Sequence, residues 1–143
     1  MRVGRLDELV ADVRAAFERV HREQFLADPV ANPRLAVDVV DSAVVEDTPA
    51  VVLLTPWTVN GLAFPPDDRF PEALEIAGRR RPVFRITMQE LGAFRSVNLP
   101  LDPAGLSGMA QARRLARSWA APFQDAVAAA RRDHAANADH GGT

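Results

Sequence analysis

The fold of this chain is decided by one stretch, Ala50-Val51-Val52-Leu53-Leu54-Thr55-Pro56-Trp57-Thr58-Val59-Asn60. Its apolar first half predicts a central strand buried on both faces, since a half-exposed strand would alternate apolar and polar residues. Pro56 has no N–H for a sheet ladder, so the strand should end or bulge there. Trp57 carries a large apolar side chain with one donor, a type favoured in cores and at interfaces. The segment offers no general base or metal ligand, and it predicts either a rigid corner or a binding surface.

The residues on either side of this stretch predict neighbouring strands. The apolar residues Leu35, Val37 and Val39 alternate with Asp38 and Asp41, as in a strand with one wet face, and a turn over 46–49 follows. Residues 58–64 predict the next strand, in which Gly61 should mark a bulge or a close backbone approach. The run Pro-Pro-Asp-Asp at residues 65–68 predicts a loop.

The second half of the sheet is less regular in sequence. Residues 70–76 fit either a short helical turn or a strand, and the run Arg-Arg-Arg-Pro at 79–82 predicts an exposed turn. Residues 83–88 and 93–99 predict two further strands. About five strands in consecutive order favour an antiparallel meander. The side chains expected to point inward from the first of these two strands are Phe84, Ile86 and Met88.

Helical spacing marks both ends of the chain. Apolar residues recur at steps of three and four over residues 6–25 and again over residues 109–130. Pro122 interrupts the second stripe and should kink the helix or restart it near Ala121. The expected fold is α+β: an antiparallel or mixed sheet of about five strands with an N-terminal helix and a kinked or two-part C-terminal helix.

The composition is that of one ordinary globular domain. The 143 residues are 48% hydrophobic and 25% charged, and the net charge of −2 gives no electrostatic footprint for nucleic acid. All 17 basic residues are arginine, and the lack of lysine excludes a Schiff-base enzyme and a P-loop. The lack of cysteine excludes disulfides, thiolate metal sites and cysteine nucleophiles. Residues 1–136 should form a single domain and residues 137–143 a disordered tail.

The sequence predicts a cytoplasmic protein. No secretory signal precedes the first helical pattern, and no apolar stretch approaches the ~18 residues of a membrane span. His21, His134 and His140 should lie at the surface or at its boundary, and no spacing of histidines predicts a metal site. We therefore expect no metal and no cofactor. Exposed sheet edges make a homodimer a further possibility.

Two groups of residues allow both a structural and a binding interpretation. The acidic residues Asp38, Asp41, Glu46 and Asp47 fit a solvated strand face and turn, or a patch that attracts a basic peptide. Asp67 and Asp68 could extend such a patch. Trp57 and Asn60 fit a core tryptophan with a loop-capping amide, or a surface that anchors a partner. Arg85 and Arg95 are expected to project outward into solvent.

The motifs of this chain resemble those of the HybE/HupJ family of [NiFe]-hydrogenase assembly chaperones, in an order that spans residues 17–119. Asn32-Pro33 before the strand from Leu35 is similar to the family's Asn-Pro-x-Leu start. Thr55-Pro56-Trp57-Thr58-Val59-Asn60 is similar to its Thr-Pro-Trp-x-Met-Asn core, with Val59 in place of the methionine. Phe64-Pro65 stands where the family has Leu-Pro. Residues 95–101 keep the serine and proline of its Cys-Ser-Leu-Phe-Ser-Pro-Met segment, and Arg95 replaces the cysteine.

The resemblance implies a small α/β protein that binds hydrogenase precursor subunits and holds them back from premature export by the twin-arginine pathway. Some relatives carry a rubredoxin domain, which this cysteine-free chain lacks. A non-enzymatic chaperone is thus the leading hypothesis, since its partner-binding surface needs no catalytic residue. An acidic patch beside exposed apolar surface would suit a twin-arginine signal. The residues expected at the partner surface are Pro56, Trp57, Asn60, Arg95, Ser96, Pro100, Asp38 and Asp41.

Two other classes of function remain open from sequence. The first is a small-molecule-binding α+β domain, with a pocket between the sheet and the C-terminal helix lined by Trp57 and Trp119. The second is a cofactor-free enzyme that uses Asp or Glu side chains, although two carboxylates alone do not make a hydrolase without a shaped cleft.

Overall fold

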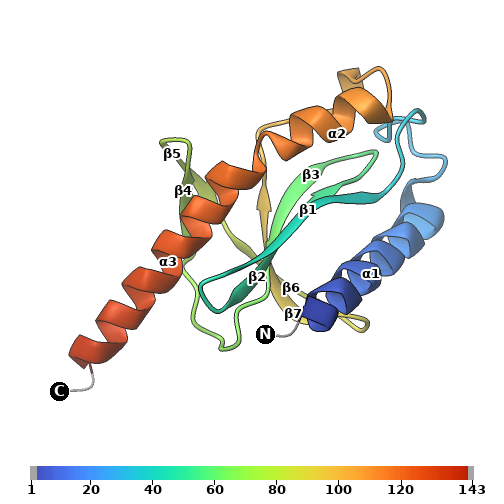
Figure 1. Ribbon diagram of the computed structural model, residues 1–143. Coiled ribbons are helices and arrows are strands. Elements are labelled where there is room, and N and C mark those ends of the chain that lie inside the picture. The colour runs from blue at the N-terminus through green and yellow to red at the C-terminus, as the bar shows by residue number, and fades with distance from the viewer. Residues whose placement is uncertain (1–2, 142–143) are drawn as a thin grey trace.

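The central strand β2 (Thr48–Leu54) lies inside a five-stranded antiparallel sheet (Figure 1). This computed structural model describes the backbone of residues 3–141 and the side chains of residues 5–133. The strand order is β1-β2-β3-β7-β6, and a separate two-stranded hairpin is formed by β4 and β5. The remaining elements, in chain order, are α1 (Val3–Val20), the π-helix η1 (His21–Phe25), β1 (Asp38–Val45), β3 (Val59–Ala63), β4 (Ala73–Ile76), β5 (Arg79–Pro82), β6 (Phe84–Met88), β7 (Gly92–Asn98), the 3-10 turn η2 (Pro103–Gly105), α2 (Met109–Arg117) and α3 (Ala120–Gly141).

Both faces of β2 are buried, as its continuous apolar run predicts. Val51 and Leu53 point to one face and form a cluster with Val13 of α1. Val52 and Leu54 point to the other face and pack in the cluster that includes residues of α2 and α3. Because successive side chains of a strand alternate, a strand that is apolar throughout needs a layer on each side. Figure 1 shows α1 on one side of the sheet and the α2–α3 pair on the other.

The expected consecutive meander holds only for β1, β2 and β3. The chain then leaves the sheet, forms the β4–β5 hairpin and returns at the far edge as β6, so that β7 fits between β3 and β6. The undecided segment 70–76 contains strand β4, and the turn expected over 79–82 is strand β5. The turn lies instead at Ala77 and Gly78, whose φ angles of 52° and 80° fit a two-residue hairpin connection.

Strand β6 is less covered than its sequence pattern predicts. Phe84 and Ile86 are cross-strand partners of Ser96 and Phe94, so they face the α1 side of the sheet. Phe84 nevertheless keeps 48% and Ile86 36% of its surface exposed. The expected inward burial of these two side chains is therefore wrong. The reason is the reach of α1, which packs over β1 and leaves the outer part of β6 uncovered.

The C-terminal helix has two parts, as Pro122 predicts. Helix α2 ends at Arg117, and α3 begins at Ala120 after a turn. Pro122 falls in the first turn of α3, where its missing N–H leaves no hydrogen bond unmade. The structure continues α3 to Gly141, into the stretch where the composition predicts a tail, and alanine-rich sequence favours helix. Among the described residues, no helix is long and apolar enough to cross a membrane.

Gly61 marks a close approach and not a bulge. The pairing of β3 with β2 and β7 runs through Gly61 without a register shift. A Cβ atom built on Gly61 would lie 2.5 Å from the ring of Phe123, a side chain that is 1% exposed. The missing side chain of Gly61 therefore makes room for the aromatic ring that fixes α3 on the sheet.

We predict that Gly61→Ala lowers the free energy of unfolding by about 1–3 kcal/mol, because the new methyl group overpacks the core against Phe123. Denaturant unfolding measures the change. Gly105→Ala is the matched control, since nothing lies within 4 Å of a Cβ atom there. Equal stability of the Gly61 and Gly105 variants would contradict the close-packing account.

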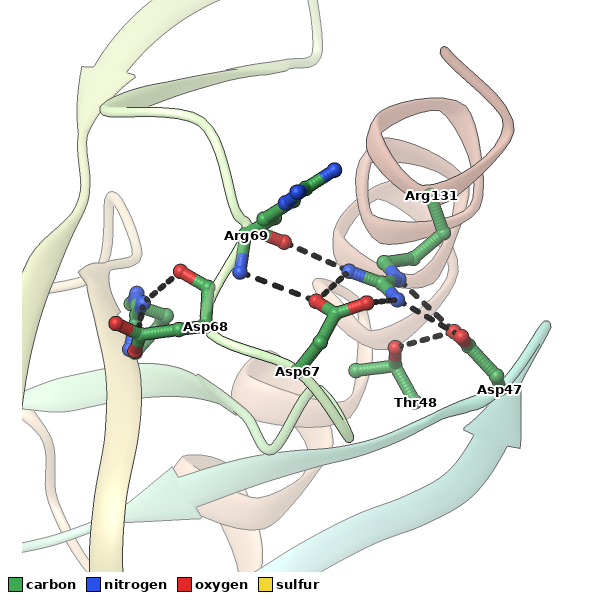
Figure 2. A network of polar contacts seen from close by, with 7 residues as sticks. Asp47, Thr48, Asp67, Asp68, Arg69 and Arg131 are labelled. Carbon is green, nitrogen blue, oxygen red and sulfur yellow. Dashed lines mark hydrogen bonds and ion pairs between the residues drawn. The ribbon is translucent and has the colours of Figure 1, made fainter. Parts of the chain in front are cut away.

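A buried arginine ties α3 to two loops (Figure 2). The side chain of Arg131 is 4% exposed, and its guanidinium donates to both carboxylate oxygens of Asp47 at 2.8 Å. The same group donates to both carboxylate oxygens of Asp67 at 3.1 Å and to the carbonyl oxygen of Arg69 at 2.7 Å. Asp47 follows β1, whereas Asp67 and Arg69 belong to the loop after β3. The two acidic positions thus bind an arginine of the chain itself.

The ion pair lowers the pKa of Asp47. Hydrogen bonding from Arg131 is the largest cause, and it brings the pKa from 3.8 to about 2. Since the folded pKa lies below the unfolded one, the stabilisation is complete above the unfolded pKa. It is lost as the pH falls through the folded pKa.

We predict that Asp47→Asn lowers the Tm near neutral pH and that the difference from the unchanged chain narrows as the pH falls from about 5 to about 2. Thermal unfolding followed by circular dichroism over this range tests the prediction. Asp125→Asn, at an exposed carboxyl group on α3, serves as the control. A Tm difference for Asp47→Asn that stays constant with pH would contradict the role given to this ion pair.

Candidate binding groove

A groove of about 850 Å³ lies between the end of α1, the π-helix η1 and the β6–β7 hairpin. We call it the α1–β6 groove. Helical residues form one wall, the turn after β6 forms the other, and side chains of β3, β6 and β7 form the floor. Residues that line it include Phe17, Val20, Asn60, Ile86, Phe94 and Ser96. The exposed ring of Phe84 follows Ile86 along the same face of β6.

The floor of the groove carries a short chain of polar side chains. Asn60 donates through Nδ2 to Ser96 Oγ at 2.9 Å, and its Oδ1 accepts from Thr58 Oγ1 at 2.9 Å. Asn60 and Ser96 come from neighbouring strands β3 and β7, which bring together two of the residues expected at the partner surface. The groove therefore combines an apolar floor with a few fixed polar groups, as ligand and peptide sites commonly do.

The Thr-Pro-Trp corner beside the groove is rigid. Thr55 is fully buried, and its hydroxyl group donates to Thr58 O at 2.8 Å and accepts from Thr58 N at 2.9 Å. Pro56 is buried, and its carbonyl oxygen accepts from the N–H of Asn32 at 2.8 Å. The stretch that ends the central strand is thus held by hydrogen bonds on both sides of the proline.

Asn32 joins this corner to the loop before α2. Its side-chain nitrogen donates to the carbonyl oxygens of Pro103 at 2.8 Å and Leu106 at 2.9 Å, and its Oδ1 accepts from Arg34 N at 3.0 Å. The residue is 7% exposed, so a side chain without these partners would be costly. The sequence marked Asn32 only as part of a motif, whereas the structure gives it a connecting role.

Trp57 is neither a free anchor nor a fully buried plug. Its ring stacks on Phe25 with 4.1 Å between centroids and 5° between planes, and His21 lies 5.7 Å away. The side chain is partly buried and packs against the cluster under α1. Both aromatic partners belong to η1, the π-helical turn that contributes to the groove wall. π-helical turns often occur at functional sites.

An ion pair joins the two walls of the groove. Arg19 of α1 donates through Nε and Nη2 to the two carboxylate oxygens of Glu90, in the turn after β6, and through Nη1 to Glu23 at 3.0 Å. The hydrogen bond from Arg19 holds the pKa of Glu90 below its ordinary value. Among the described residues that line the groove, Glu90 is the one carboxylate, and it is already paired.

The other residues expected at the partner surface lie elsewhere. Arg95 is 7% exposed and donates to the carbonyl oxygen of Asp68 at 2.9 Å, so the expectation that it projects into solvent is wrong. Its neighbour Arg85 is exposed and pairs with the same aspartate at 2.8 Å. Pro100 lines a smaller pocket beside Trp119. Asp38 and Asp41 face the helices.

The acidic residues of β1 and its turn are paired within the chain. Asp38 contacts Arg14 of α1 at 3.3 Å and Arg113 of α2 at 2.8 Å. Asp41 accepts a hydrogen bond from Gln124 at 2.6 Å. Glu46 pairs with Arg132 of α3 at 3.2 Å. The acidic cluster of the sequence is therefore a set of helix-to-sheet contacts.

The two tryptophans lie against different clusters. Trp57 packs with the cluster under α1, and Trp119 packs with the cluster under α2 and α3. The single pocket expected between sheet and C-terminal helix, lined by both tryptophans, is therefore not formed. The side chains of His134 and His140 lie outside the described residues. Within the described part of the chain, no group of three His, Cys, Asp or Glu residues is placed to hold a metal ion.

The fold defines a three-layered α+β protein with a groove between α1 and the β6–β7 hairpin. The chain belongs to the [NiFe]-hydrogenase assembly chaperone HybE family, whose model matches residues 8–139. The solution structure of HybE from Escherichia coli is similar to it, with a TM-score of 0.62 and 21% sequence identity over 82% of this chain and 77% of that one. This structural likeness confirms the expected fold. Comparison with curated proteins gave no match.

We predict that Trp57→Ala speeds hydrogen exchange of the amides in residues 21–25 by roughly tenfold. The stack with Phe25 is worth about 0.5–1.5 kcal/mol beyond its buried area. Trp57→Phe is the matched control, because a smaller ring can still stack and should keep most of the protection. Unchanged exchange in the alanine variant would show that η1 does not depend on this contact.

Proposed function

We propose that this chain is a non-enzymatic chaperone that holds a segment of a [NiFe]-hydrogenase precursor subunit in the α1–β6 groove. The observation that carries the proposal is the uncovered apolar row of Phe84 and Ile86, which continues from the groove floor to the edge of the sheet. An exposed apolar patch beside a groove is typical of an interaction surface. Membership of an assembly chaperone family supports a precursor subunit as the partner.

The edge strand β6 offers backbone groups as well as side chains. It pairs with β7 on one side, and in the described part of the chain no other strand pairs with its outer side. An extended partner segment can add to such an edge by main-chain hydrogen bonds, while alternate side chains of the segment meet Phe84 and Ile86. This mode would hold an unfolded precursor segment without any catalytic group.

The finer proposal is that the bound segment includes the twin-arginine signal of the small subunit. Such a signal joins basic residues to an apolar stretch, and the groove places Glu90 next to an apolar floor. An incoming arginine would replace Arg19 on Glu90, since both present the same guanidinium to the same carboxylate. A chaperone that covers the signal acts before export, which would place this chain in the cytoplasm.

Asp38 and Asp41 remain only a prediction as partner contacts. Each carboxylate already accepts from a side chain of α1, α2 or α3. A basic peptide would have to displace those partners. At the Glu90 end of the groove, an incoming arginine has to replace only Arg19. This exchange costs little free energy because the ion pair is exposed. The structure therefore favours the groove over β1 as the site for a basic segment.

We predict that Phe84→Ser combined with Ile86→Ser weakens binding of a purified small-subunit precursor at least tenfold, because two apolar contacts are lost. Stability should fall less than for two core substitutions, since 48% of Phe84 and 36% of Ile86 is exposed. Val44→Ser, at an exposed valine on the opposite edge strand β1, is the matched control. Surface-immobilised chaperone titrated with precursor gives the dissociation constants.

Two further arms separate the coarse proposal from the fine one. If the signal is the bound segment, the unchanged chaperone should bind a precursor without its signal only weakly. The dissociation constant should then match that of the double variant with the intact precursor. Equal binding with and without the signal would refute the twin-arginine proposal and leave the chaperone proposal standing. Equal binding by the double variant and the Val44→Ser control would refute the groove itself.

A second candidate function is the binding of a small apolar molecule in the same groove. A volume of about 850 Å³ is in the range of small-molecule sites, and its floor carries one polar chain, from Thr58 through Asn60 to Ser96. Mass spectrometry of the native purified chain distinguishes the two candidates. A co-purified small molecule that the precursor does not displace would favour this alternative.

A further inference from the structure

A second, smaller pocket of about 210 Å³ lies apart from the groove. It is bounded by the β4–β5 hairpin, by the turn that follows β7 and by the break between α2 and α3. Its lining consists of Ile76, Ala77, Arg79, Arg81, Pro100 and Trp119. Ile76 and Trp119 pack with the cluster under α2 and α3, so the pocket opens on the face of the sheet away from α1.

Hairpin register brings two arginines to this pocket. Arg79 is the cross-strand partner of Ile76, and Arg81 is the partner of Leu74. Directly opposed residues of an antiparallel pair point to the same side. Because Ile76 and Leu74 are buried in the core, the two arginines lie on the inner side of the hairpin. Arg80 is paired with Glu75 in the register and points to the outer side.

The two arginines have unused hydrogen-bond donors. Arg81 makes one long contact, from Nη1 to the carbonyl oxygen of Asn98 at 3.4 Å, and its buried Nε has no acceptor among the described residues. Within the same residues, no hydrogen bond or ion pair is formed by the side chain of Arg79. The described residues that line the pocket include no carboxylate. The Nε atom of Arg81 is closed to solvent, so the donors open to a ligand are Nη2 of Arg81 and the guanidinium of Arg79.

We propose that this pocket binds a carboxylate group of a partner polypeptide. The contact that Arg81 makes through Nη1 leaves Nη2 without an acceptor among the described residues, and this nitrogen can donate to a carboxylate oxygen. Arg79 supplies a second positive charge. Trp119, Pro100 and Ile76 provide apolar surface for the side chain next to that carboxylate.

The size of the pocket favours a carboxylate with one small apolar neighbour. A volume of about 210 Å³ is below the usual range for small-molecule sites, so it would accept the end of a chain or one side chain and little more. The carboxylate can come from a chain terminus or from an Asp or Glu side chain. The proposal goes beyond the function proposed above, because it concerns a different face of the molecule and does not depend on the identity of the client.

The test uses the fluorescence of Trp119. Because the chain has two tryptophans, a Trp57→Phe background leaves Trp119 as the one reporter. Three short acetylated peptides are titrated: Ala-Ala-Val with a free C-terminal carboxylate, the same peptide as its C-terminal amide, and Ala-Asp-Ala as its amide. Inorganic phosphate is the fourth probe. Calorimetry with the unchanged chain repeats each titration and does not depend on the Trp57 substitution.

We predict that the free carboxylate peptide changes Trp119 emission and that the matching amide binds at least tenfold more weakly. Arg79→Gln and Arg81→Gln should each weaken binding about tenfold, as expected for loss of a charged hydrogen bond. Arg80→Gln, on the outer side of the same strand, is the matched control and should bind normally. Circular dichroism establishes that each variant is folded.

The outcomes decide both the site and the source of the group. Preference for the free terminus supports a C-terminal carboxylate, and equal binding of the Asp peptide supports a side-chain carboxylate as well. Equal binding of the amide, equally tight binding of phosphate, or no binding by any peptide overturns the proposal. An equal loss on Arg80→Gln would also overturn it, since general charge attraction would then explain the binding.

Discussion

The burial of β2 on both faces is the constraint on which the rest of the structure depends. A strand with apolar side chains on both faces needs a covering layer on each face of its sheet. Val51 and Leu53 require a helix on one side, and Val52 and Leu54 require helices on the other. Because α3 must pack close to the sheet, the neighbouring strand β3 carries Gly61 where the ring of Phe123 lies. The burial of this one strand on both faces thus requires the helices at both ends of the chain.

The features that the sequence predicted correctly are those that a few neighbouring residues determine. The apolar run of β2, the amphipathic N-terminal helix and the effect of Pro122 are each encoded within a few residues, and the structure confirms them. The sequence left residues 70–76 open between a helical turn and a strand. Strand β5 was missed because three arginines followed by a proline fit an exposed turn, and only the dipeptide Ala77-Gly78 signals the true turn. The exposure of Ile86 depends on where α1 lies over the sheet, which no local spacing reveals. The burial of Arg95 likewise depends on a loop 27 residues earlier in the chain.

Several motif residues form contacts inside the chain, whereas Phe84 and Ile86 lie outside the motifs. Asn32, Thr55 and Pro56 form hydrogen bonds within the chain, and one face of the Trp57 ring stacks on Phe25. These residues build the corner beside the groove, whereas the exposed side chains of Phe84 and Ile86 are on β6, outside every motif quoted for the family. Asn60 and Ser96, which belong to the quoted motifs, line the groove, whereas no motif signals the exposed side chains of β6.

Asp67 and Asp68 are adjacent in sequence, yet their side chains point in opposite directions (Figure 2). Asp67 binds Arg131 of α3, and Asp68 binds Arg85 of β6 and Arg95 of β7. The loop that carries these two residues therefore contacts α3 on one side and β6 and β7 on the other. Through Asp67 and Asp68, this loop connects the long C-terminal helix to the edge of the sheet. A partner bound at the edge strand would be linked through these two carboxylates to a helix on the other face of the molecule.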